Sequence, residues 1–256
     1  MDSYLKGRHV VVTGAGTGIG RAIAERLGRE GAKLTLLARD RERLEETKSA
    51  LPGEAMVLAC DIRDEARVTQ AFDEAAAHNG PIYGLVANSG IGGPNEPGPD
   101  DRFHDLVATN LIGSYSCARA AQRHLESGDE ARHLIFMSSI LARIGVGGYT
   151  GYCASKAALL GLARSLAVEL APDNVQVNAI CPGWVNTAMA REGLEGMASS
   201  IGCSFDEARG KALEQVPLAR MSEPEDVAGL VYWLLSPDAR GVTGQGIDMN
   251  GGAFMS

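Results

Sequence analysis

The chain has 256 residues, of which 45% are hydrophobic and 22% are charged, and its formal net charge is −8. One α/β domain with a sizeable core fits this length, and no shift in composition suggests a second domain. Acidic and basic residues are interleaved along the chain, which argues against nucleic acid or an anionic membrane as a partner.

Two further features concern metal binding and compartment. The five cysteines lack a C-x-x-C pair and the five histidines lack metal-ligand spacing, so we expect reduced thiols and no metal site. The N-terminal stretch has an acidic second residue and only a three-valine run before turn residues begin. It predicts neither a signal peptide nor a membrane span, and we expect a cytoplasmic protein.

The first unit of the chain is a strand, a glycine-rich turn and a helix. His9–Thr13 is a β-branched run, and the helical pattern Arg21–Glu30 closes at Gly31. Glycines let the backbone approach a pyrophosphate, and the start of a helix stabilises its charge. Such turns also occur for packing reasons, but this placement favours nucleotide binding. The candidate residues are Thr13, Gly14, Thr17, Gly18, Ile19 and Gly20.

The second strand, Lys33–Ala38, ends where the choice between NAD and NADP is usually made. Arg39 can pair with the 2′-phosphate of NADP, whereas Asp40 can hold the ribose 2′-hydroxyl of NAD. Asp40 also fits as the N-cap of a helix that begins at Arg41. We therefore favour NADP and keep NAD as the alternative.

The next two strands add candidates for the same cofactor site. Ala55–Ala59 leads to an aspartate whose carboxylate could accept from the adenine amino group or could cap the following helix. Ile82–Ala87 leads to a turn of small residues, where the backbone could approach the cofactor. The candidates are Asp61, Ile62, Asn88 and Gly90.

The middle of the chain supplies two polar residues beside apolar elements. The long helical pattern Asp105–Ala121 contains Asn110. A mid-helix Asn is usually solvent-facing or structural, but one that kinks a helix near a lysine could hold a water. The apolar run His133–Met137 predicts a buried strand, so we expect the Ser139 hydroxyl at the carboxyl end of that strand, where open α/β sheets bind ligands.

Tyr152 and Lys156 are four residues apart in a segment of helical composition, so they are expected to share one helix face. A nearby cation favours phenolate and lowers the pKa of a phenol, which would let Tyr152 donate or accept a proton. The same spacing is common in amphipathic surface helices. It gains weight only from the rest of the chain.

The last third of the chain continues the alternation of strands and helices. Val175–Ile180 predicts a strand, residues 188–216 predict one or two short helices that form a substrate lid, Pro224–Leu235 a helix, and Gly246–Met249 a last strand. We therefore predict an α/β fold with a doubly wound parallel sheet, as a single domain over residues 1–256. The turn after the first of these strands holds the cofactor candidates Pro182, Gly183, Val185 and Thr187.

Six motifs in this order resemble the short-chain dehydrogenase/reductase family across essentially the whole chain. They are Thr13-Gly14-x-x-x-Gly18-Ile19-Gly20, the Asp61 turn, Asn110, Ser139, Tyr152-x-x-x-Lys156 and Pro182-Gly183-x-x-x-Thr187. The resemblance implies a Rossmann-like fold of three α/β/α layers and a nicotinamide cofactor. One departure is Ala87, where the family usually has Asn; we expect some loss of local hydrogen bonding and no effect on the reaction type.

The resemblance also implies a reaction, the interconversion of a ketone and a secondary alcohol by hydride transfer. Ser139 and Tyr152 would hydrogen-bond the carbonyl oxygen, and Tyr152 would protonate the alkoxide. Lys156 would lower the phenol pKa and hold the nicotinamide ribose, and Asn110 would anchor a water. Family members are mostly tetramers, so we expect a homotetramer or, alternatively, a homodimer.

The substrate is less closely defined. The predicted pocket is mostly apolar, with no obvious Arg or Lys cluster for a carboxylate or phosphate, and fits a medium-sized, largely uncharged ketone. The lid length and residues 216–226 also resemble 3-oxoacyl-carrier-protein and polyketide reductases. A non-catalytic nucleotide-sensing protein and a dehalogenase-type lyase are two rival functions, and Lys156 counts against both. The pocket candidates are Ser139, Leu141, Tyr149, Tyr152, Trp184 and Met189, with Leu194 and Met197 from the lid.

Overall fold

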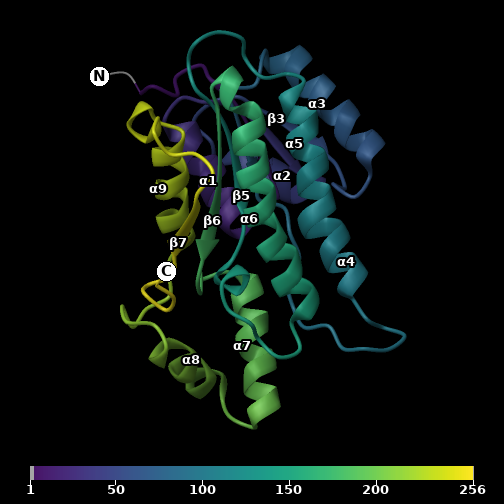
Figure 1. Ribbon diagram of the computed structural model, residues 1–256, viewed down its shortest axis with the longest axis vertical. Coiled ribbons are helices and arrows are strands. Elements are labelled where there is room, and N and C mark those ends of the chain that lie inside the picture. The colour runs from purple at the N-terminus through teal and green to yellow at the C-terminus, as the bar shows by residue number, and fades with distance from the viewer. Residues whose placement is uncertain (1–2, 256) are drawn as a thin grey trace.

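A computed structural model describes residues 3–255; Met1, Ser256 and the acidic second residue, Asp2, lie outside the described residues. Within this range, seven strands form one parallel sheet in the order β3-β2-β1-β4-β5-β6-β7 (Figure 1). The strands are β1 His9–Thr13, β2 Lys33–Ala38, β3 Ala55–Ala59, β4 Gly84–Ala87, β5 Arg132–Met137, β6 Val175–Pro182 and β7 Gly246–Met249.

Helices cover both faces of the sheet, which confirms the predicted three-layer, Rossmann-like fold. The apolar core between the sheet and α3, α5 and α6 is separate from the core between the sheet and α1, α2 and α9. The helices are α1 Gly18–Arg29, α2 Arg41–Ser49, α3 Glu65–Asn79, α4 Phe103–Val107, α5 Ser114–Gln122, α6 Thr150–Leu170, α7 Ala188–Ile201, α8 Phe205–Glu214 and α9 Pro224–Leu234.

The valines of β1 show how the sequence produces these layers. Successive side chains of a strand point to opposite faces of the sheet. Val11 accordingly packs in the core with α3, α5 and α6, while Val10 and Val12 pack in the core with α1 and α9. Because both faces are covered, a parallel strand needs an uninterrupted apolar run rather than an alternating one.

The strand order creates a crevice at the carboxyl ends of the central strands β1 and β4. From β1 the chain moves outward to β2 and β3, and it then returns to β4 on the other side of β1. The connections after β1 and β4 therefore diverge to opposite faces at the carboxyl ends of these strands. Open α/β sheets bind ligands at such a switch point.

Two predicted boundaries are corrected by the structure. The fourth strand begins at Gly84 because Ile82 makes only an isolated bridge, to Leu125. The helix expected over Asp105–Ala121 is divided into α4, a π-helical turn over Ala108–Gly113, and α5. An extra residue in such a turn re-aims nearby side chains, and π-turns are frequent at functional sites.

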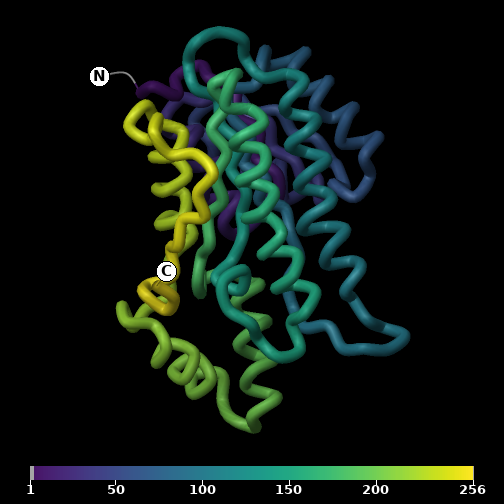
Figure 2. The backbone as a smooth tube through the Cα atoms, in the orientation of Figure 1, coloured from purple at the N-terminus to yellow at the C-terminus, as the bar shows by residue number. Residues whose placement is uncertain are grey.

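The segment 188–216 contains α7 and α8, which lie together at the lower end of the view (Figures 1 and 2). The capping of both helices follows from the sequence: Thr187 accepts from the Ala190 amide and Ser204 from the Glu207 amide. No helix within residues 3–255 is long and apolar enough to cross a membrane.

Candidate active site

The glycine-rich turn after β1 is shaped for a close approach of backbone. Gly14 and Gly18 have φ of +66° and +51°, conformations that favour glycine. A Cβ on Gly20 would lie 2.1 Å from the Gly14 oxygen, so the first turn of α1 packs directly on the loop. Thr17 is the N-cap of α1 without a side-chain capping bond. The unpaired amides at this helix start suit a pyrophosphate.

Thr13 joins the ends of β1 and β4. Its hydroxyl oxygen accepts from the Asn88 amide at 3.0 Å and from the Ser89 amide at 2.9 Å. The Asn88 side chain returns the contact by donating to the main-chain oxygens of Thr13, at 3.1 Å, and Gly14, at 3.3 Å. Thr13 therefore holds the turns after β1 and β4 together. Ala87 packs in the apolar core.

Asp40 and Arg39, the two residues at the end of β2 that could select the cofactor, have different surroundings. The Asp40 carboxylate accepts from the Arg43 amide at 3.2 Å as the N-cap of α2, and it pairs with the Arg43 guanidinium at 3.2 Å. Arg39 is exposed and makes no hydrogen bond or ion pair among the described residues. Arg43 was missed in the sequence; a Cβ on Gly16 would lie 3.1 Å from the Arg43 Cβ, so this arginine borders the glycine turn.

Asp61, at the end of β3, is held by its own neighbour. Its carboxylate accepts from the Arg63 amide at 3.0 Å and from the Arg63 guanidinium at 2.7 Å. These bonds hold the pKa of Asp61 below its ordinary value. The alternative role as a helix cap is wrong, because Asp64 caps α3. Ile62 is buried against Gly113 of the π-helical turn.

The π-helical turn places Asn110 in the interior, fully buried. Its side-chain oxygen accepts from the Ile91 amide at 2.8 Å, and its amide nitrogen donates to the Ile91 oxygen at 3.0 Å and to the Ser155 hydroxyl at 3.1 Å. A Cβ on Gly90 would lie 3.1 Å from the Asn110 oxygen and 3.2 Å from the Lys156 ammonium. Asn110 therefore orients the loop after β4 beside Lys156; Ser155 in this contact was missed.

Ser139, Tyr152 and Lys156 meet where β5 ends and α6 begins its first turns. The Lys156 ammonium donates to the Met137 oxygen at 2.8 Å and lies 5.6 Å from the centre of the Tyr152 ring. The Ser139 hydroxyl oxygen accepts from the Leu141 amide at 3.1 Å, and this serine also hydrogen-bonds the Tyr152 phenol.

The structure does not give the Tyr152 phenol the low pKa that the sequence led us to expect. Burial is the largest influence on Tyr152 and raises its pKa, while the hydrogen bond from Ser139 lowers it. Burial also lowers the pKa of Lys156 to about 8, which weakens the cation that a phenolate would need. The helical spacing brings the two side chains together, but the apolar surroundings reverse the predicted direction for Tyr152.

The connection after β6 lies against the glycine turn. Thr187 donates to the Val185 oxygen at 3.2 Å, and its methyl group would be 3.2 Å from a Cβ on Gly18. A Cβ on Gly183, after Pro182, would lie 2.9 Å from the Asn250 Cα, so this glycine permits close packing against the chain after β7. Two turns far apart in sequence, the glycine turn and the connection after β6, thus meet at the start of α1.

The predicted pocket residues fall into separate places. Leu141 is half-buried near Ser139, and Tyr149 is half-buried at the start of α6. Met189 is 45% exposed, and its sulfur would be 2.9 Å from a Cβ on Gly92, across the crevice. Trp184 packs near Gly193 of α7, and Met197 is half-buried farther along this helix.

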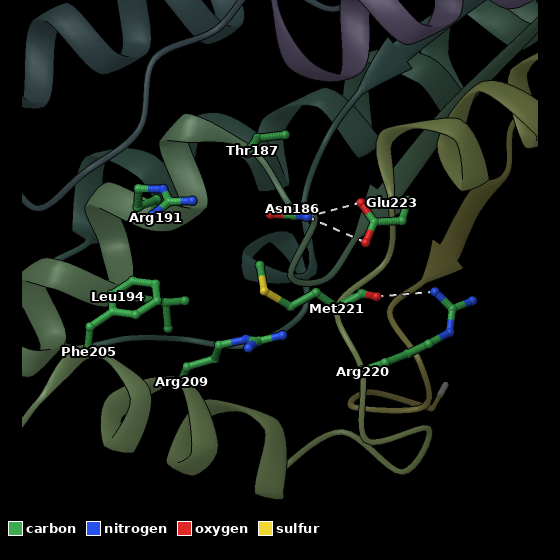
Figure 3. Close-up of a pocket in the computed structure, with 9 residues that line it drawn as sticks. All are labelled: Asn186, Thr187, Arg191, Leu194, Phe205, Arg209, Arg220, Met221 and Glu223. Atoms are coloured by element: carbon green, nitrogen blue, oxygen red, sulfur yellow. Dashed lines mark hydrogen bonds between the residues drawn. The ribbon is translucent and has the colours of Figure 1, made fainter.

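Leu194 lines a different cavity, of about 530 Å³, between α7, α8 and the segment before α9 (Figure 3). We expected no arginine or lysine cluster in the predicted pocket, but three arginines line this cavity together with the lid residue Leu194. They come from α7, α8 and the segment before α9, which pack around one cavity. The spacing of these arginines in the sequence does not reveal that they lie together. The lining residues are Asn186, Thr187, Arg191, Leu194, Phe205, Arg209, Arg220, Met221 and Glu223.

Known proteins similar to this chain share both the sequence pattern and the fold. A family model described as Enoyl-(Acyl carrier protein) reductase matches residues 14–253. The 3-oxoacyl-(acyl-carrier-protein) reductase MabA of Mycobacterium tuberculosis is 34% identical over 251 residues, which cover 97% of this chain and 93% of that protein. The corresponding reductase FabG of Escherichia coli is 31% identical over 252 residues, 98% of either chain. A Brucella melitensis structure titled short-chain dehydrogenase/reductase SDR:Glucose/ribitol dehydrogenase superposes with a TM-score of 0.88 at 30% identity, covering 100% of both chains.

Proposed function

The chain belongs to the short-chain dehydrogenase/reductase family, and from this premise we propose that it is an NADP-preferring ketoreductase that interconverts a ketone and a secondary alcohol. The observation that carries the proposal is the meeting of Ser139, Tyr152 and Lys156 at the carboxyl end of β5. A proton donor, a hydrogen-bond donor and a cation are the groups that carbonyl reduction requires.

A bound nicotinamide cofactor would supply the hydride. Its pyrophosphate fits the turn at Gly14 and Gly18, where a Cβ on Gly20 would fill the space next to the backbone. Gly90 would approach the nicotinamide ribose beside Lys156, and Thr187 would hold the carboxamide. The remaining candidates would line the same cofactor site. They are Thr13, Thr17, Ile19, Arg39, Asp61, Ile62, Asn88, Pro182, Gly183 and Val185.

In the reductive direction, Ser139 and Tyr152 hydrogen-bond the substrate oxygen and polarise the carbonyl group. Tyr152 then gives its proton to the alkoxide oxygen. Its raised pKa keeps the phenol protonated at neutral pH, as a proton donor requires. Lys156 stabilises the phenolate that remains, and Asn110 keeps the loop after β4 in place through Ile91.

NADP is preferred because Arg39 is free to pair with a 2′-phosphate, whereas the Asp40 carboxylate is engaged by Arg43. Arg43, whose Cβ would lie 3.1 Å from a Cβ on Gly16, is a second arginine next to the glycine turn. NAD remains the alternative if Asp40 accepts from the ribose in addition to capping α2. We further propose that the chain works as a single domain with residues 188–216 as its lid, in a homotetramer.

The substrate class is the finer part of the proposal. The crevice beside Leu141, Tyr149, Trp184 and Met189 suits a medium-sized ketone. The relatives whose names specify 3-oxoacyl-(acyl-carrier-protein) reduction make 3-oxoacyl thioesters the first substrates to test.

The experiment is titration of the purified protein with NADPH and NADH, followed by turnover of a 3-oxoacyl thioester and of simple cyclic and aromatic ketones. Tighter binding of NADPH and oxidation of NADPH by a ketone are expected. Cofactor binding with no turnover of any ketone or secondary alcohol would contradict the reductase. Tighter binding of NADH would assign the ribose to Asp40.

A further inference from the structure

We propose that the cavity between α7, α8 and the segment 216–223 binds an anionic group, a carboxylate or a phosphate, carried by the substrate away from its ketone. This inference rests on the proposed ketoreductase function and names its substrate class. It changes the expectation from a largely uncharged substrate to one with a charged end.

Two guanidinium groups in the cavity have no acidic partner. Arg191 lies one helical turn after Thr187, with its guanidinium 5.8 Å from the centre of the Phe205 ring, and Arg209 enters from α8 (Figure 3). Neither forms an ion pair among residues 3–255. Arginine holds planar and tetrahedral oxyanions through paired N–H donors, so this arrangement suits a carboxylate or a phosphate.

The other charged residues at the cavity are already matched. Arg220 pairs with Asp226 at 2.8 Å and donates to the Met221 oxygen at 3.1 Å. The Glu223 carboxylate accepts from the Asn186 side chain at 3.1 Å. Arg191 and Arg209 therefore remain as the free positive charges.

None of the acidic residues of α7 and α8 lines the cavity. The cavity is lined by three arginines and one glutamate, although the whole chain carries a net charge of −8. The excess of positive charge, which would attract an anion, is confined to the lining, because α7 and α8 as a whole carry five acidic and three basic residues. The acidic residues outside the lining are Glu192, Glu195, Asp206, Glu207 and Glu214.

The cavity also offers room and apolar contacts for the arm that would carry the anion. Its volume of about 530 Å³ lies within the usual range for small-molecule sites. Leu194, Phe205 and Met221 supply apolar surface. Thr187 lines the cavity and also lies against Gly18 of the glycine turn, so the cavity adjoins the proposed cofactor site. A substrate from the active site could therefore extend beneath the lid helices.

The test compares matched substrates that differ in one charge. The first pair is 4-oxopentanoate and its methyl ester; the second is a 3-oxobutanoyl thioester of phosphopantetheine and of pantetheine. Arg191→Met and Arg209→Met remove one guanidinium each and keep an apolar stem. Lys211→Met removes an equal charge from an exposed position of α8 outside the lining.

For at least one pair, the ratio of kcat/KM for the anionic member to that for the neutral member should fall about tenfold or more in each arginine variant, the scale of a charge-assisted hydrogen bond. The ratio should not change in Lys211→Met. The pair that responds identifies a carboxylate or a phosphate. Unchanged ratios in both arginine variants would overturn the anion site and leave the ketoreductase intact.

Binding without turnover separates the two proposals. Calorimetry with inorganic phosphate and with 4-oxopentanoate should show binding of at least one to the wild type, weakened in Arg209→Met. If this loss occurs and no ketone is reduced, the anion site stands and the reductase fails. If the arginine variants instead lose NADPH affinity with unchanged substrate ratios, the arginines belong to the cofactor site and the inference is wrong.

Discussion

The Lys156 ammonium donates a hydrogen bond of 2.8 Å to the main-chain oxygen of Met137, the last residue of β5. The Ser138 hydroxyl returns a bond of 2.8 Å to the main-chain oxygen of Lys156. Helix α6 is therefore tied to the end of β5 in two places. Tyr152, one turn before Lys156, is held beside Ser139 as a consequence.

Replacing Tyr152 with Phe removes the proposed proton donor and keeps the ring. We expect kcat to fall by about 10²–10⁴-fold, the range for general acid–base groups. The dissociation constant for NADPH, measured by fluorescence titration, should change by no more than a few-fold. Turnover close to that of the wild type would show that another group supplies the proton.

The buried Lys156 should make stability depend on pH. Its pKa is lowered to about 8 in the folded protein, so the unfolded chain binds more protons above this pH, and stability rises with pH. Between pH 8 and 10, we expect the wild type to gain about 2 kcal/mol over Lys156→Met. Urea unfolding of both proteins at pH 8, 9 and 10 measures this difference. A difference that stays constant would mean that Lys156 titrates normally.

Arg39→Ala should weaken NADPH binding by about 1.5–3 kcal/mol, the range for a hydrogen bond to a charged group, and leave NADH binding nearly unchanged. Arg41→Ala is the matched control, because Arg41 is also exposed and pairs with Glu45 at 3.5 Å. Calorimetric titration of both variants with both cofactors gives the comparison. Equal losses of NADPH and NADH in Arg39→Ala would remove this arginine from the phosphate site.

Gly20→Ala and Gly229→Ala test the packing of the glycine turn. A Cβ on Gly20 would lie 2.1 Å from the Gly14 oxygen, whereas a Cβ on Gly229 of α9 would meet nothing within 4 Å. We expect Gly20→Ala to lower the thermal midpoint and abolish cofactor binding. Gly229→Ala should be neutral or stabilise by about 0.5–1 kcal/mol, as for an open helix position. Normal NADPH binding by Gly20→Ala would contradict the tight turn.

Much of the architecture follows from the sequence because its causes are local. Apolar runs such as His9–Thr13 fix the strands, and glycines fix the turn after β1. The spacing of Tyr152 and Lys156 fixes their shared helix face. These features depend on near neighbours, so no knowledge of distant contacts was needed to predict them.

Only the tertiary structure decided how distant groups influence one another. It half-buries Tyr152 and buries Lys156, so desolvation raises one pKa and lowers the other, against the sequence-based expectation for the phenol. It also brings Arg191 and Arg209 from two helices to one cavity. Burial and electrostatic environment are set by how whole elements pack against one another, and residue spacing carries no information on either.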